Sequence, residues 1–306
     1  MPQATVTSTR TPSGDDTIEL CYETFGDASN ETMLLVMGYT AQMNAWPQEM
    51  IDDLVARGFH VVIFDNRDVG LSAKSEGAPP DVVSLLARGA AGETIGADEV
   101  PYTLTDMASD AIGLLDHHGI DTAHVAGASM GGMIVQMLAI EHPTRLRSVT
   151  SIMSTTGSRD VGQATPAAMG ALLQPPPQGK EAVIAQNMVT GRVIAGPLFD
   201  EARAMARAEE TYERCFHPIG AAFQLAAIGA TGDRTEHLGS VDVPFLVIHG
   251  DKDDLIQVSG GHATASAVPK ADLLVLDAMG HDIPVPLLPQ INGAIEAIAR
   301  RQPLGY

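Results

Sequence analysis

Short apolar runs recur along the first half of the chain and again near its end. Each is dense in aliphatic side chains, which is typical of strands that are buried on both faces of a mainly parallel sheet. The runs are residues 33–37, 61–64, 123–128, 148–154, 243–249 and 272–276. An earlier segment, 17–24, alternates in polarity and predicts a strand at the edge of the sheet.

Stretches with helical spacing separate these runs. They are residues 46–57, 104–118, 132–141, 260–268 and 287–300. Gly58 follows the first stretch and Pro143 the third, where glycine favours a helix end and proline cannot continue a helix. Strands that alternate with helices predict an open, mainly parallel α/β sheet with right-handed crossovers.

The alternation stops between residues 157 and 239. This stretch has Ala-rich helical pieces, which prolines at 175–177, 197 and 218 interrupt. We predict a helical cap inserted over the carboxyl edge of the sheet, where ligands bind in open α/β folds. The predicted core domain is then 1–156 with 240–306, and the predicted cap is 157–239.

Composition narrows the class of protein. The 306 residues are 45% hydrophobic and carry a formal net charge of −20, which favours a globular protein and disfavours nucleic acid and anionic membranes as partners. Residues 1–16 lack the apolar core of a signal peptide, and no run reaches the roughly 18 apolar residues of a spanning helix. We expect a soluble, cytoplasmic protein, with monomer and homodimer both open.

The strongest chemical signal is Gly127-Ala128-Ser129-Met130-Gly131, a G-x-S-x-G motif between an apolar run and a helix. This setting predicts a sharp turn at which the backbone approaches itself closely at both glycines. The turn would lift the Ser129 hydroxyl above the sheet at a helix N-terminus. We therefore predict that Ser129 is a nucleophile.

A serine nucleophile needs a base, and in this setting the order is serine, acid, histidine. His281 follows the 272–276 strand and is the predicted base. Three carboxylates follow the strand before it. We favour Asp253, three residues after Gly250; Asp251 is expected to cap the turn and Asp254 to point elsewhere, and both stay open as alternatives.

The remaining histidines and both cysteines are expected to be structural. No histidine pair has metal-ligand spacing with a nearby acid, so no metal is predicted. Cys21 and Cys215 are more simply two free thiols than one disulfide.

The oxyanion of an acyl-transfer reaction needs two donors. We expect the backbone N–H groups of Met130, after the nucleophile, and of Tyr39, after the first buried strand. The alternative is that Gly38 marks only a tight turn there.

These residues resemble the α/β-hydrolase superfamily, and in particular its branch that contains aclacinomycin methylesterase. Met37 stands where many members have histidine before the oxyanion-loop glycine, and Asp68 where many have glycine, as in that branch. Further matching segments are Leu34 to Gly38, Trp46-Pro47 and Asp65 to Ser72. The last is expected to be a structural turn that braces the nucleophile. The resemblance implies a carboxylic-ester hydrolase that needs no cofactor and acts through an acyl-enzyme.

The predicted cap is rich in methionine and leucine, which indicates an apolar cleft for a small to medium ester or lactone. Expected substrate contacts are Gly38, Met153, Phe223 and Ile283. The alternative is that the apolar side chains only pack the core of the cap.

Three other functions stay open. A triad of serine, histidine and aspartate also performs carbon–carbon hydrolysis and cofactor-free perhydrolysis. Non-catalytic ligand-binding homologues retain the same triad. An aspartate nucleophile is disfavoured because Ser129 fills the motif.

Overall fold

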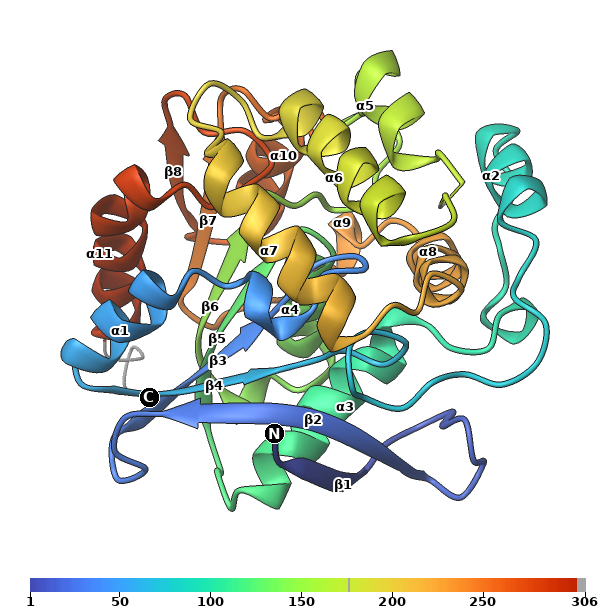
Figure 1. Ribbon diagram of the computed structural model, residues 1–306. Coiled ribbons are helices and arrows are strands. Elements are labelled where there is room, and N and C mark those ends of the chain that lie inside the picture. The colour runs from blue at the N-terminus through green and yellow to red at the C-terminus, as the bar shows by residue number, and fades with distance from the viewer. Residues whose placement is uncertain (176, 302–306) are drawn as a thin grey trace.

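The computed structural model describes residues 1–175 and 177–301. Its eight strands form one sheet in the order β1-β2-β4-β3-β5-β6-β7-β8 (Figure 1). β2 is antiparallel to both β1 and β4, whereas β4, β3 and β5 to β8 run parallel. The strands are β1 (Gln3–Thr7), β2 (Thr17–Phe25), β3 (Glu31–Val36), β4 (Phe59–Phe64), β5 (Ala123–Ala128), β6 (Leu146–Ile152), β7 (Phe245–Gly250) and β8 (Asp272–Leu276).

Helices connect the strands and cover the sheet. The α-helices are α1 (Gln48–Ala56), α2 (Val82–Ala90), α3 (Leu104–His117), α4 (Met130–Glu141), α5 (Pro166–Leu172), α6 (Lys180–Ile194), α7 (Glu201–Arg214), α8 (Gly220–Thr231), α9 (Thr235–Leu238), α10 (Ser259–Ala267) and α11 (Leu288–Ala299). Short 3-10 turns are η1 (Met43–Ala45), η2 (Ala97–Glu99), η3 (Pro143–Arg145) and η4 (Val285–Leu287).

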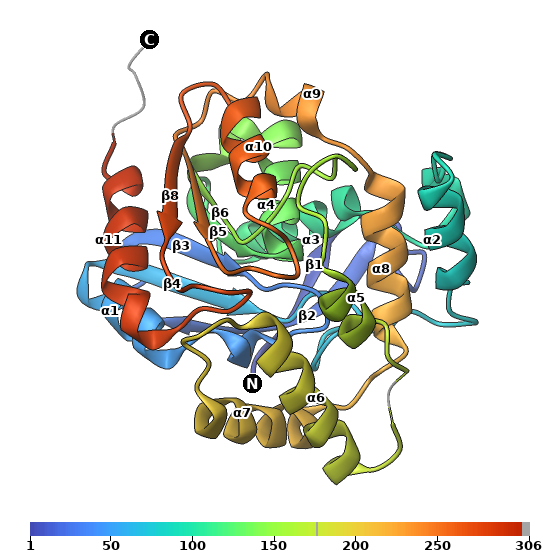
Figure 2. The same cartoon turned by 90° about the horizontal axis from the view of Figure 1, so that it is seen from above.

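The sheet is buried between two layers of helices (Figures 1 and 2). α1 and α11 pack together on one face, and α3, α4 and α10 cover the other. Alternate β3 residues enter separate clusters: Leu34 and Val36 pack with α3 and α4, and Met33 and Leu35 pack with α1 and α11. This two-sided burial explains why the central strands are almost continuously apolar.

One sequence prediction is wrong. The segment 17–24 lies within β2, but β2 is not an edge strand, because β1 pairs along its outer side in the register Ala4↔Leu20 and Val6↔Ile18. β1 has only two buried side chains, Ala4 and Val6, between exposed polar residues. Five residues with so little apolar character carry almost no periodic signal.

The segment between β6 and β7 contains α5 to α9, and its described residues, 153–175 and 177–244, form no strand. Seen from above, α5 to α8 lie on the side of the sheet where the parallel strands end, and they extend past the edge of the sheet (Figure 2). α6 packs on α7, α8 packs on α2, and α9 packs on α4 and α10 of the core. We refer to 157–239 as the insertion; its division from the core as a cap domain stays a prediction.

Two further observations concern the whole molecule. Among the described residues, no helix combines the length and apolar character that a transmembrane span requires. Cys21 and Cys215 are both free thiols, as the sequence favoured.

Candidate active site

Ser129 occupies a sharp turn between β5 and α4. Its backbone has φ 56° and ψ −117°, an uncommon conformation for a residue with a side chain. The turn brings backbone against backbone: a Cβ on Gly127 would lie 2.0 Å from the carbonyl oxygen of Gly131. Only glycine fits there, which gives the motif its physical basis. The Ser129 N–H donates to the Ile152 carbonyl at 2.9 Å and fixes the turn to β6.

His281 and Asp253 converge on this serine from the ends of two later strands. The Nε2 atom of His281 lies 2.9 Å from the Ser129 Oγ, and its Nδ1 atom lies 2.8 Å from Oδ2 of Asp253. The imidazole therefore joins hydroxyl and carboxylate in one line, the arrangement in which a histidine can take the proton of an attacking serine.

The Asp253 carboxylate is enclosed and fully paired. Its side chain has no exposed surface, and its Oδ1 accepts the backbone N–H groups of Leu255 at 2.9 Å and Ile256 at 2.8 Å. Burial by itself raises the pKa of this group, but His281 and His249 outweigh burial and lower the pKa to about 2. Asp253 is thus anionic at neutral pH and can stabilise a protonated His281.

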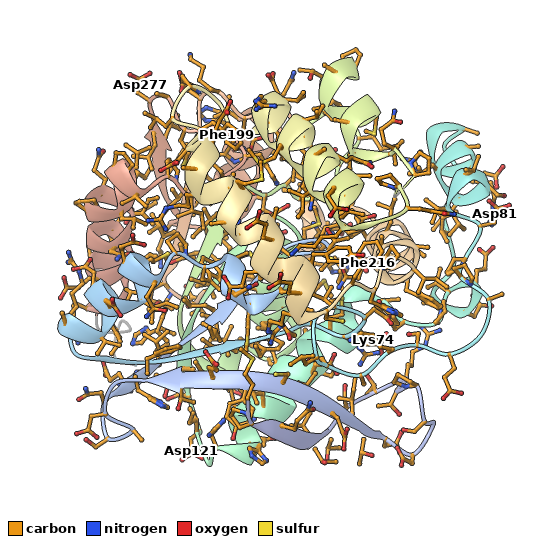
Figure 3. The ribbon with its side chains drawn as sticks, in the orientation of Figure 1. Lys74, Asp81, Asp121, Phe199, Phe216 and Asp277 are labelled. Carbon is orange, nitrogen blue, oxygen red and sulfur yellow. The ribbon has the colours of Figure 1, made fainter. Side chains whose placement is uncertain are left out.

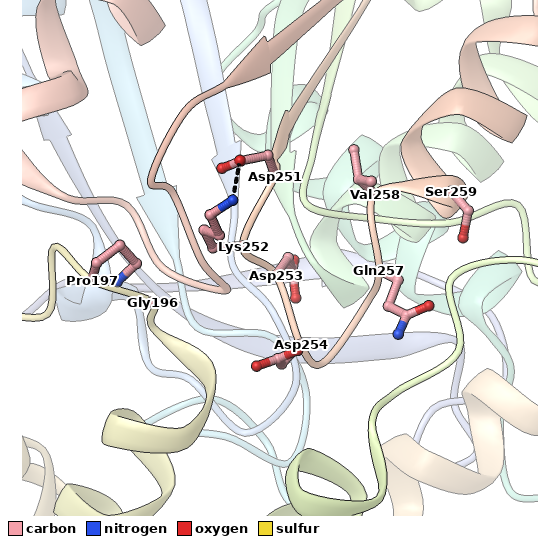
Figure 4. A pocket seen from close by; sticks show the side chains of 9 residues that line it. All are labelled: Gly196, Pro197, Asp251, Lys252, Asp253, Asp254, Gln257, Val258 and Ser259. Carbon is pink, nitrogen blue, oxygen red and sulfur yellow. Dashed lines mark hydrogen bonds and ion pairs between the residues drawn. The ribbon is translucent and has the colours of Figure 1, made fainter.

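The other two candidate acids do not contact the histidine. Asp251 pairs with Lys252 at 2.6 Å and accepts the Ala278 N–H at 2.8 Å, so it holds the turn, as the sequence indicated. Figure 4 shows Asp251, Asp253 and Asp254 along one loop. A cavity of about 450 Å³ adjoins this loop; its lining includes Asp253 but neither Ser129 nor His281.

The two expected oxyanion donors lie beside the nucleophile. Met130 is the first residue of α4, and Tyr39 follows Gly38, where an added Cβ would lie 3.0 Å from the Ser129 Cβ. Within the described residues, neither the Met130 N–H nor the Tyr39 N–H donates to a protein acceptor. The Thr40 N–H, by contrast, donates to Gln224 at 2.8 Å. The donor role of Tyr39 and Met130 stays a prediction.

The expected substrate contacts lie in different environments. Gly38 lies against Ser129, and Met153 is buried directly after β6. Phe223 is 1% exposed within the core cluster around α3 and α4, so packing accounts for it. Ile283, two residues after His281, lines a separate cavity of about 340 Å³. Their roles in binding stay predictions.

The apolar residues of the insertion divide between its core and its surface. Met188 is buried with Ile184 and Ala208 between α6 and α7, as the packing alternative expected. Met169, Leu173, Met205 and Phe216 are 40–44% exposed. Figure 3 shows Phe216 near one end of α7 and Phe199 near the other.

Two residues near the site were missed from the sequence. Gln224 of α8 is fully buried and binds the segment that carries Tyr39. Asp282, next to His281, has an Oδ1 with no hydrogen-bond partner among the described residues, and burial outweighs the attraction of Arg207 and raises its pKa to about 6. For Gln224, the sequence offered one signal, a single glutamine within the apolar stretch 220–230. For Asp282, it offered none.

Comparison with known proteins places this geometry in context. The family model described as "alpha/beta hydrolase fold" matches residues 31–285. Rhodomycin D methylesterase DnrP of Streptomyces peucetius is 25% identical over 94% of this chain and 96% of its own. 3-Oxoadipate enol-lactonase 2 of Acinetobacter baylyi is 27% identical over 93% of this chain and 94% of its own.

A solved structure extends the likeness of fold. The meta-cleavage product hydrolase of Pseudomonas fluorescens superposes with a TM-score of 0.73 at 16% identity, over 96% of each chain. At that identity the likeness concerns the fold alone.

Proposed function

The chain belongs to the α/β-hydrolase fold family, and on this basis we propose that it is a serine hydrolase of carboxylic esters or lactones. The observation that carries the proposal is the continuous line from the Ser129 Oγ through His281 to Asp253, with contacts of 2.9 and 2.8 Å. Two relatives that match over almost their whole length are, by name, a methylesterase and an enol-lactonase.

In the proposed reaction the Ser129 Oγ attacks the ester carbonyl carbon while His281 Nε2 takes the hydroxyl proton. The C=O bond becomes a C–O⁻ group, which the Tyr39 and Met130 N–H groups stabilise, and Asp253 stabilises the imidazolium. The tetrahedral intermediate then re-forms the carbonyl and breaks the bond to the leaving oxygen. His281 returns the proton to that oxygen, so the alcohol leaves, or a lactone ring opens, with the acyl group on Ser129.

A water molecule completes the cycle. His281 takes one proton from it, the remaining hydroxide attacks the acyl carbon, and the Ser129 oxygen leaves and regains the proton. The products are a carboxylic acid and free enzyme. No other reagent is needed for the balance.

The proposal includes a small to medium, mostly apolar substrate. The apolar side chains of the insertion that stay exposed, Met169, Leu173, Met205 and Phe216, support this choice, since the insertion extends over the strand ends (Figure 2). The strongly negative net charge of −20 gives no support for an anionic macromolecule as substrate.

A panel of aryl esters and lactones with varied acyl length tests the proposal, together with labelling by a fluorophosphonate. We expect turnover of at least one ester and stoichiometric labelling at Ser129. The Ser129→Ala variant should lose both while its melting temperature stays near wild type. Labelling without turnover of any ester or lactone would point instead to carbon–carbon or perhydrolase chemistry, and substantial turnover by Ser129→Ala would contradict the proposed nucleophile.

A further inference from the structure

The side chain of Gln224 connects the insertion to the loop beside the nucleophile. Its Oε1 accepts the Thr40 N–H at 2.8 Å, and its Nε2 donates to the Arg67 carbonyl at 2.9 Å. Gln224 is completely buried on α8. We infer that Gln224 is a positioning residue, which holds the oxyanion loop (residues 37–43) in the conformation that the reaction needs. This inference rests on the proposed function.

The two ends of the oxyanion loop are fixed by the core. The Asn66 Nδ2 donates to the Met37 carbonyl at 2.8 Å, and the Asp65 Oδ1 accepts the Met43 N–H at 2.8 Å. Both side chains belong to the turn after β4. That turn therefore braces the oxyanion loop, a role close to the bracing expected from the sequence.

The middle of the loop depends on α8. The Thr40 N–H donates to Gln224 at 2.8 Å, and the Ala41 N–H closes a local turn to the Gly38 carbonyl at 3.3 Å. Further along the loop, the Gln42 side chain donates to the Thr211 and Cys215 carbonyls around the end of α7, but among the described residues the backbone N–H of Thr40 itself is bonded only to Gln224. Thr40 has φ 57°, a left-handed conformation that is unfavourable for a β-branched residue. Such a conformation persists only where its surroundings hold it.

The anchor of Gln224 is itself rigid. Arg67, whose carbonyl receives the Nε2 bond, is fully buried and forms two bonds of 2.6 and 2.7 Å with Asp110 of α3. The amide of Gln224 thus links the rigid Arg67 carbonyl to the Thr40 N–H, in the peptide group that follows Tyr39. Loss of this amide would let Thr40 relax toward ordinary φ values and turn the neighbouring Tyr39 N–H away from the oxyanion.

This role differs from simple attachment of the insertion. Preorganised donors accelerate a reaction because they need no reorganisation when charge develops, so disorder in the loop should act on kcat and much less on KM. A purely structural glutamine would affect the folded fraction instead. Gln136 of α4 provides a matched control: it is also completely buried, and it bonds Ser151 and Arg234 rather than the oxyanion loop.

The experiment compares Gln224→Met, Gln224→Glu and Gln136→Met with wild type in ester hydrolysis, at a temperature where each is folded by circular dichroism. Gln224→Met removes both bonds at similar volume. Deleting a whole oxyanion donor costs about 10²–10³-fold in kcat, so misplacing one should cost about 10–100-fold, with KM nearly unchanged. Gln136→Met should lower the melting temperature and leave kcat close to wild type.

Gln224→Glu adds a second measurement, the pH dependence of kcat, which would not change if Gln224 only attached the insertion to the core. A protonated Glu can donate to the Arg67 carbonyl and accept from Thr40, as Gln does, whereas the carboxylate cannot donate. Burial raises the pKa of such a carboxyl, so kcat relative to wild type should be restored at low pH and should fall as pH rises. This comparison also decides the matter if Gln224→Met does not fold.

The outcomes separate the two proposals. Wild-type kcat in folded Gln224→Met, or a Gln224→Glu profile parallel to wild type at every pH, would overturn the role of Gln224. A wild-type protein that neither hydrolyses esters nor reacts with the fluorophosphonate at Ser129 would overturn the proposed function itself.

Discussion

The backbone N–H of His281 donates to the carbonyl of Ile194, the last residue of α6, at 2.7 Å. The insertion thus supports the loop that carries the proposed base as well as the oxyanion loop. We call this contact between residues 194–196 of the insertion and residues 280–281 the seam. Within the seam, Gly280 packs directly on Ala195 and Gly196, and an added Cβ would lie 2.3 Å from the Ala195 carbonyl carbon.

Gly280→Ala should therefore displace the His281 loop. Because misplacing a catalytic group by about 1 Å can cost about 10²-fold, we expect kcat for ester hydrolysis to fall by about 10–100-fold. Gly293→Ala is the control, since Gly293 lies in α11 with nothing within 4 Å of an added Cβ. It should raise the free energy of unfolding by up to about 1 kcal/mol and leave kcat unchanged. A wild-type kcat in folded Gly280→Ala would show that the seam does not position the base.

Asp253→Asn should lower kcat by about 10³–10⁴-fold, because the amide no longer holds the imidazole in the reactive tautomer or stabilises its cation. Asp251→Asn is the matched change two residues earlier. Asp251 pairs with Lys252 and the turn rather than with His281, so this variant should stay near the wild-type rate. Steady-state kinetics on one ester checks both. If Asp251→Asn suffers the large loss, the assignment of the acid is wrong.

Asp282→Asn should make stability less dependent on pH. Burial raises the pKa of Asp282 from 3.8 to about 6 in the folded protein. Between about pH 4 and pH 6 the folded state therefore holds more protons at this group than the unfolded state, and stability falls as pH rises through that window. The difference in pKa corresponds to about 3 kcal/mol at pH 7.

We expect urea unfolding to show Asp282→Asn more stable than wild type at pH 7, by up to about 3 kcal/mol, and equal to wild type below pH 4. Asp277→Asn is the control, since Asp277 lies exposed near the end of β8 (Figure 3). If Asp282→Asn and wild type are equally stable at pH 7, burial does not destabilise the Asp282 carboxylate.

Asp110→Ala should destabilise the protein strongly. The side chains of Arg67 and Asp110 are 0% and 2% exposed, and removal of one partner leaves a buried charge without compensation. Such changes cost about 3–5 kcal/mol in the free energy of unfolding. Glu201→Ala breaks the exposed pair with Arg192, which solvent screens, so its free energy of unfolding should stay close to wild type. Similar losses in urea unfolding for the two variants would contradict this account.

The sequence by itself determined the central parallel strands, the helices that alternate with them and the turn that carries the proposed nucleophile. The turn itself is a local feature: a Cβ on Gly127 would meet the Gly131 carbonyl within the motif. Gly131 is required by a contact that the motif does not contain, since its Cβ would lie 2.0 Å from the Val36 carbonyl oxygen at the end of β3. The order of serine, acid and histidine placed two further candidates at strand ends, since the carboxyl ends of parallel strands meet at one edge.

Only the tertiary structure decided which carboxylate meets His281. Asp251, Asp253 and Asp254 share one loop, and the direction of each side chain depends on the conformation of that loop against β8. β1 was hidden for a related reason, as its two buried side chains gain meaning only through pairing with β2. Gln224 could not be assigned at all, because its partners Thr40 and Arg67 lie 184 and 157 residues away, and a hydrogen bond at such a distance leaves no local pattern.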